Sequence, residues 1–166
     1  AFLQSLGRPG RQAPVPGDPR RGASLFDQAG CRRCHMIQGA GGFLGPDLSD
    51  AALRFTTEDL RRSIVDPAAA VPEGFRPVTV IAGNGERITG LLKNDSNFTL
   101  EILREDGAYF SAPRSSVREA PAPQPTLMPT DYQRRLTAAD LQDLLAFLDQ
   151  QRAEGRAASV WLVKAH

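Results

Sequence analysis

Residues 31–35 read Cys-Arg-Arg-Cys-His, and this run constrains the rest of the chain more than any other feature. Two thiols separated by two residues can form thioether bonds to the two vinyl groups of one haem, and a histidine directly after the second thiol is placed beneath the iron. The motif therefore predicts one covalent haem c, attached through Cys31 and Cys34, with His35 as an iron ligand.

Other uses of the two cysteines explain less of the motif. A disulfide or a thioredoxin-like redox pair expects a βαβ context and leaves His35 unexplained. A structural zinc ion normally needs four ligands, whereas the chain has no further Cys and only one other His, His166. Two unrelated buried cysteines would leave the adjacency of all three residues to chance.

The sequence contains two methionines that can be considered for the opposite face of the iron. Met36 follows His35 directly and should not reach that face. Met128 lies far downstream, before a proline, and its soft thioether would stabilise ferrous iron. We predict Met128 as the second iron ligand; the alternative is a methionine that only fills the core.

The turn Gly45-Pro46-Asp47-Leu48 follows the motif closely. A proximal histidine usually donates its outer N–H to a backbone carbonyl, which fixes its tautomer. We predict that the carbonyl of Pro46 accepts this bond from His35. The alternative is a plain turn between a loop and a helix.

Three helices are predicted, over about 18–29, 56–66 and 137–154. The first begins at an Asp-Pro pair, and the other two begin at a Thr-x-x-Asp sequence that resembles a capping box. They should end before Gly30, Pro67 and Gly155, respectively. The glycine-rich residues 36–55 predict a loop that wraps something.

Residues 76–118 change to an alternation of apolar and polar side chains, which predicts an antiparallel meander of four or five strands. Turn sequences lie at 83–85, 94–96 and 105–107. Four prolines within 120–129 then favour an extended return path. The alternating apolar residues are Val78, Val80, Ile88, Leu92, Phe98, Leu100 and Ile102.

We therefore expect a mainly α protein with a small antiparallel β module inserted in it, α+β overall. Residues 1–17 are predicted to form an irregular arm or linker, 18–70 and 121–155 the haem domain, 71–120 the inserted module, and 156–166 a tail. The insert has no Cys or His, so a second metal site is not expected in it. Its role is predicted to be protein contact or shielding of the haem edge, or it is purely structural.

Taken in order, these motifs resemble the class I cytochromes c. Gly22 and Phe26 resemble the family's Gly-x-x-x-Phe pattern, which packs against a last helix that here contains Leu144-Leu145-Ala146-Phe147-Leu148. The resemblance covers about residues 18–48 and 126–152. It implies a haem-wrapping helical fold, His35 and Met128 as iron ligands, and an electron carrier rather than an enzyme.

The whole arrangement is also similar to haem-binding domains that have a β module between the middle helix and the methionine loop. Such domains often end large bacterial proteins assigned as membrane-bound dehydrogenases. This similarity implies that electrons come from a fused dehydrogenase domain or from a redox partner protein. Contacts to the haem propionates are left open, because Trp161 lies beyond the last helix.

Two other functions stay open. In a peroxidase or a small-gas sensor the iron would be five-coordinate, and Arg114 or Arg118 from the insert would be the candidate distal residues. In a redox-silent interaction module, the β insert would carry the function instead.

The composition of the chain and the chemistry of haem attachment limit which partners and which cellular location are expected. The chain has 20 basic and 19 acidic residues, so it lacks the field that nucleic-acid binding usually needs. No segment approaches the roughly 20 apolar residues of a transmembrane helix. Because thioether attachment occurs outside the bacterial cytoplasm, we expect a periplasmic or exported protein. We also expect a monomer.

Overall fold

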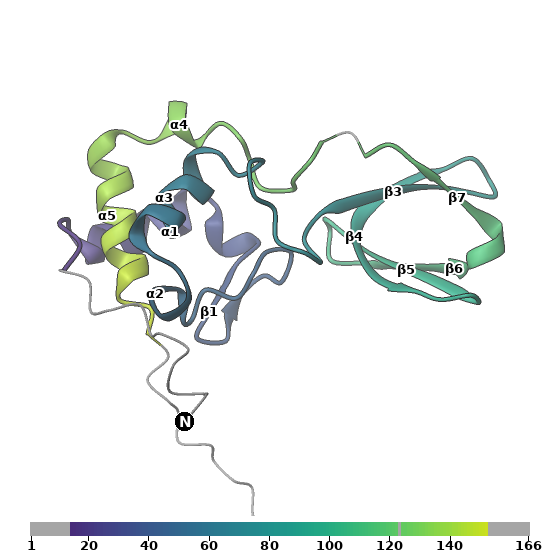
Figure 1. Ribbon diagram of the computed structural model, residues 1–166, viewed down its shortest axis with the longest axis horizontal. Helices are drawn as coiled ribbons and strands as arrows, with labels where there is room; N and C mark the ends of the chain where they lie inside the picture. Colours follow the sequence, from purple (N-terminus) through teal and green to yellow (C-terminus); the bar gives the residue numbers. More distant parts are fainter. Residues whose placement is uncertain (1–13, 123, 153–166) are drawn as a thin grey trace, which may run out of the picture.

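The computed structural model describes residues 14–122 and 124–152. A helical part and a strongly curved sheet lie side by side along the long axis of the molecule (Figure 1). Of the predicted arm over 1–17, only 14–17 are among the described residues. The predicted tail over 156–166 lies outside them, as does Trp161.

The three predicted helices are present, together with three shorter helical segments and a small hairpin that the sequence did not indicate. The capping boxes at Thr56 and Thr137 both form, because each threonine and the aspartate three residues later cap one another. In order, the helical part contains α1 (Pro19–Gln28), η2 (Cys31–Arg33), β1 (Met36–Ile37), β2 (Ala40–Gly41), α2 (Ala51–Arg54), α3 (Thr57–Val65), α4 (Tyr132–Arg135) and α5 (Ala138–Asp149).

Helix α5 ends at Asp149, several residues before the predicted end at Gly155. Beyond it the chain meets α2, where the carbonyl of Gln151 accepts a hydrogen bond from the N–H of Ala52 (3.1 Å). The side-chain amide of Gln151 donates to the carbonyl of Phe147 (2.9 Å). The bond to α2 lies where sequence pattern alone predicted another turn of helix.

Helices α1 and α5 pack closely at Gly22. A Cβ atom on Gly22 would lie 2.0 Å from the carbonyl oxygen of Asp143, so only glycine fits this crossing. One turn further along α1, the ring of Phe26 meets that of Phe147 with centroids 5.6 Å apart. Phe26 is only 1% exposed and belongs to the core of the helical part. The contact predicted between the first and last helices is therefore present.

A buried carboxylate fixes the same two helices at the start of α1. Asp143 accepts a hydrogen bond from the backbone N–H of Asp18 (2.7 Å) and pairs with the guanidinium of Arg21. Arg21 also pairs with Asp140 on α5. The bond to Asp18 and the cation of Arg21 lower the pKa of Asp143. The carboxylate is thus stabilised in its charged form although it is largely buried.

The sheet contains five antiparallel strands in the order β6-β5-β4-β3-β7. The first four strands of this sheet form the predicted meander, and β7 returns to pair with the free side of β3. Its strands are β3 (Pro77–Ala82), β4 (Arg87–Asp95), β5 (Thr99–Arg104), β6 (Tyr109–Pro113) and β7 (Val117–Ala120), and the short helix η3 (Arg114–Ser116) connects the last two. The chain enters at Pro77 and leaves at Ala120, which lie at the same end of the sheet.

The sheet encloses a second hydrophobic core, separate from that of the helical part. The alternating apolar residues line one face, as predicted, with Phe98 as the exception. Phe98 lies in the turn between β4 and β5 and is 83% exposed. The members of this core are Val80, Ile88, Leu100 and Ile102, with Val78, Leu92, Phe110 and Val117 packed against them.

The expectation of a mainly α fold is wrong. Helices take up 33% and strands 25% of the described residues, and the strands form one five-stranded sheet with its own core. The protein is α+β, because the residues that alternate between apolar and polar build a sheet with a core of its own. This sheet is not a minor addition to the helical part.

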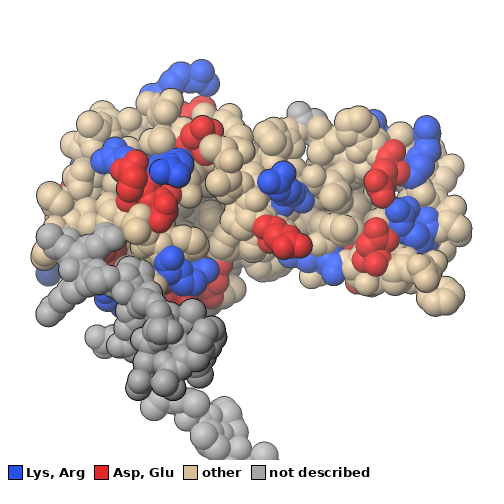
Figure 2. All heavy atoms as spheres, in the orientation of Figure 1, with Lys and Arg blue, Asp and Glu red and all other residues tan. Residues whose placement is uncertain are grey.

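Acidic and basic side chains are intermixed on the face shown in Figure 2. Acidic and basic side chains also pair within the protein, as in Arg54 with Asp50 (2.7 Å) and Arg114 with Asp95 (2.9 Å). This face therefore carries little field of a single sign. None of the helices within the described ranges combines the length and the apolar character that crossing a bilayer requires.

We predict that Gly22→Ala destabilises the helical part by about 1–3 kcal/mol, because the clash with a backbone carbonyl outweighs the better helix propensity of alanine. Gly83→Ala is the matched control. Its Cβ would meet nothing closer than 3.6 Å, so its effect should stay within about 0.5 kcal/mol. Urea unfolding followed by far-ultraviolet circular dichroism measures both, and equal effects would contradict this packing argument.

The lowered pKa of Asp143 predicts a specific acid sensitivity. Its folded pKa lies below the ordinary value of 3.8, so its contribution to stability is present above that pH and is lost as the pH falls through the folded pKa. Asp143→Asn should therefore be less stable than wild type near neutral pH and should lose less stability below about pH 4. Unfolding curves at several pH values test this, and parallel acid losses in the two proteins would refute it.

Candidate functional site

The two cysteines lie on one tight turn directly after α1. Gly30 reverses the chain with a φ of 81°, in the left-handed region that favours glycine. In η2 the N–H of Cys34 then donates to the carbonyl of Cys31 (3.1 Å). Three residues per turn place Cys31 and Cys34 on the same side of this segment. Both thiols are free and half-buried, as attachment to one flat group would require.

His35 follows on the same turn, and the geometry determines which of its nitrogens carries the proton. Its Nδ1 lies 2.8 Å from the carbonyl oxygen of Pro46, so the predicted contact with Pro46 is present. A carbonyl can only accept, so Nδ1 carries the hydrogen and Nε2 keeps a free lone pair. Burial lowers the pKa of His35, and the Pro46 carbonyl offsets this only in part. The imidazole is therefore neutral at pH 7 and able to bind a metal through Nε2.

The loop after the motif is held against the imidazole by backbone hydrogen bonds. The N–H of Gly45 donates to the carbonyl of Cys34, and that of Leu48 to the carbonyl of Met36, both at 2.8 Å. A Cβ on Gly45 would lie only 2.6 Å from Cε1 and 2.7 Å from Nδ1 of His35. The loop thus packs directly on one side of the ring and fixes its orientation.

Met128 lies at the edge of the hydrophobic core of the helical part, as does Cys31. Its backbone N–H donates to the hydroxyl of Thr126 (3.1 Å), which is 5% exposed. This bond between residues two apart holds the local conformation of the segment before α4 at the predicted ligand. The structure brings Met128 to the same core as the motif, and its role as an iron ligand stays a prediction.

Tyr132 is a residue of this site that sequence analysis missed. It is 4% exposed, and its hydroxyl donates to the carbonyl of Ala29 (3.2 Å), two residues before Cys31. Burial raises the pKa of the Cys31 thiol, and a hydrogen bond with Tyr132 lowers it in part. Burial also raises the pKa of Tyr132 to about 12, so the hydroxyl stays protonated. The signal that the sequence offered for Tyr132 was its position four residues after the predicted ligand Met128.

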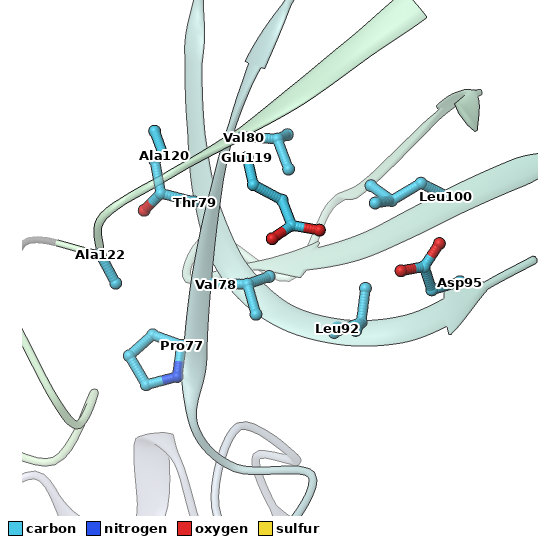
Figure 3. Close-up of a pocket in the computed structure, with 10 residues that line it drawn as sticks. All are labelled: Pro77, Val78, Thr79, Val80, Leu92, Asp95, Leu100, Glu119, Ala120 and Ala122. Carbon is cyan, nitrogen blue, oxygen red and sulfur yellow. The ribbon is translucent and has the colours of Figure 1, made fainter. Parts of the chain in front are cut away.

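The cavity drawn in Figure 3 lies within the sheet and is lined by none of the predicted site residues. It has a volume of about 190 Å³ and mostly aliphatic walls, with the carboxylates of Asp95 and Glu119 among its lining. Arg114, considered above as a distal residue, pairs with both carboxylates (2.9 and 2.8 Å). The guanidinium of Arg114 is thus engaged within the sheet.

The donor set fits a haem. Within residues 14–122 and 124–152, no group of three or more His, Cys, Asp and Glu side chains gathers as a metal site. An iron here would take most of its ligands from a porphyrin, with one imidazole and one thioether available from the chain. Two free thiols on one face of a turn match the two vinyl groups of a single haem.

A family model described as Cytochrome c matches residues 19–152, from the start of α1 past the end of α5. No curated protein matches the chain with significant similarity. The matched range includes the motif, the Met128 segment and the whole sheet. Proteins of that family hold haem c covalently.

We predict that Tyr132→Phe slows alkylation of Cys31 in the haem-free protein. Losing the hydroxyl removes the interaction that lowers the pKa of this thiol, so less thiolate is present at a given pH. Iodoacetamide labelling in a Cys34→Ser background measures Cys31 alone. Tyr109→Phe is the control, because Tyr109 is 62% exposed. Unchanged labelling in Tyr132→Phe would show that the hydroxyl does not act on Cys31.

Proposed function

Because the chain belongs to the cytochrome c family, we propose that it is an electron carrier with one haem c and His/Met axial ligation. The family supports a haem-based electron-transfer domain, an electron carrier rather than an enzyme. The observation that carries the proposal is the hydrogen bond from His35 to Pro46, because it leaves Nε2 free on the turn that bears both thiols.

Four residues would hold the group. Cys31 and Cys34 would form the two thioether bonds, Nε2 of His35 would bind one face of the iron, and the sulfur of Met128 would bind the other. When bound, the haem supplies an iron centre that can take up and release one electron reversibly. The chain supplies the attachment, the two axial ligands and an apolar surrounding.

The surroundings of these residues suit a carrier. The Pro46 carbonyl orients the imidazole and increases its basicity toward a metal. A thioether on the other face stabilises the ferrous state and raises the reduction potential relative to a second histidine. Hydrogen bonds hold the backbone beside both ligands, from Gly45 to Cys34 and from Met128 to Thr126. Ligands that stay in place keep structural change small when one electron arrives or leaves.

Partner and compartment follow from the same chemistry. We propose that electrons arrive from a dehydrogenase, either fused to this domain or separate, and leave to a second redox protein. Cytochrome c domains are typically exported. We propose a periplasmic location for this chain, because thioether attachment of haem occurs outside the bacterial cytoplasm. A monomer suffices for this role.

Optical spectra of the haem-loaded protein test the ligand assignment. Ferric wild type should show a near-infrared sulfur-to-iron charge-transfer band, and Met128→Ala should lose it and show a lower reduction potential. Met36→Ala is the matched control and should keep the band, because Met36 follows His35 in the chain. If wild type lacks the band and binds carbon monoxide or cyanide rapidly, the iron is five-coordinate and a peroxidase or gas sensor is the better explanation.

A further inference from the structure

The methionine segment, residues 126–131, leads directly into α4, where the chain returns from the sheet toward α5 (Figure 1). Inside this segment the N–H of Met128 donates to the hydroxyl of Thr126, only two residues away. Tyr132, the first residue of α4, instead bonds across 103 residues of chain, to the carbonyl of Ala29 (3.2 Å). The tyrosine hydroxyl therefore ties the methionine segment to the end of α1.

The acceptor of this bond is a carbonyl that α1 cannot satisfy by itself. Ala29 caps the C-terminus of α1, and its own N–H donates to the carbonyl of Leu25 (2.8 Å). The last four carbonyls of a helix have no partner further along the helix. The hydroxyl supplies such a partner two residues before Cys31. Its bond thus reaches the backbone from which the haem-attachment turn, residues 31–35, begins.

The bond lies in the core of the helical part. Tyr132 is 4% exposed, and Met128 and Cys31 pack against the same core. The guanidinium of Arg135 lies 5.2 Å from the centre of the tyrosine ring. A buried polar group that loses its partner is not compensated by water, so the bond resists opening. Packing and hydrogen bonding are separable here, because phenylalanine keeps the ring and loses only the hydroxyl.

We propose that Tyr132 is a positioning residue that holds Met128 on the iron, by tying the methionine segment to the haem-attachment turn. The inference rests on the proposed function. Met128 leaves the iron when its segment moves away, and the bond to Ala29 opposes that movement. Local opening is an equilibrium, and removal of a hydrogen bond shifts it toward the open state. Without the hydroxyl, Met128 should be off the iron in a larger fraction of the ferric protein.

Imidazole is a suitable probe, because it binds ferric iron at the position that Met128 leaves. Its apparent dissociation constant equals the intrinsic constant divided by the fraction of protein in which that position is open. Loss of one hydrogen bond of this kind changes such a fraction by about 2- to 10-fold. Tyr132→Phe should therefore bind imidazole about 2- to 10-fold more tightly than wild type does.

Two variants serve as controls. Tyr109→Phe removes the same hydroxyl from a side chain that is 62% exposed in the sheet, and it should bind imidazole as wild type does. Asp143→Asn weakens the contact of α5 with α1 and leaves the bond of Tyr132 to Ala29 in place. It should lower the free energy of unfolding and change imidazole binding less than Tyr132→Phe does, because local opening and global unfolding are different equilibria.

The test is a titration of the ferric, haem-loaded proteins with imidazole, followed by loss of the near-infrared sulfur-to-iron band. Equal binding by wild type and Tyr132→Phe would overturn the inference. Equal tightening in Tyr132→Phe and Asp143→Asn would also overturn it, because overall stability would then explain both. If wild type takes up no covalent haem or lacks the band, the proposed function itself is wrong; a normal band with an unresponsive Tyr132 removes only this inference.

A second measurement needs no variant, because the coupling between two sites is reciprocal. Carbon monoxide binds ferrous iron in place of the methionine, and the low-spin ferrous protein and its carbon monoxide complex are both diamagnetic. The hydroxyl proton of Tyr132 should give a slowly exchanging NMR signal in the ferrous protein and should exchange faster with water in the complex. An exchange rate that is the same in both states would overturn the inference.

Discussion

The contact of α1 with α5 at Gly22 is the constraint on which the rest of the helical part depends. Two backbones can approach so closely only where one lacks a side chain, and a Cβ there would lie 2.0 Å from a carbonyl oxygen. The cysteine motif follows α1 directly, and the Met128 segment leads into α5 through α4. Packing these two helices together therefore brings both halves of the candidate site into one core, although about 90 residues separate them in the chain.

Buried polar groups at this site and beside it are all engaged. Asp143 has the backbone of Asp18 and the cation of Arg21, and His35 has the carbonyl of Pro46. Among the described residues, no buried side-chain nitrogen or oxygen lacks a partner. An unpaired polar group would cost free energy in such a core, so these bonds fix unique orientations. The free Nε2 of His35 follows from one of them.

The sheet changes how this cytochrome c domain is understood. It has its own core and joins the helices through two connections at one end. An element attached in this way could be a passive addition to the surface. The family match over residues 19–152 covers the sheet together with the helices, so the sheet is part of the matched domain.

The motif, the helix starts and the strand alternation were predictable from the sequence, because each depends on residues within one or two turns of each other. The tertiary structure alone decided the balance of the fold, which is not mainly α, the end of α5 at Asp149 and the exposed position of Phe98. It also decided that Tyr132 reaches Ala29 across 103 residues of chain. Such contacts join segments far apart in sequence, and no local pattern records which distant partner a buried side chain will meet.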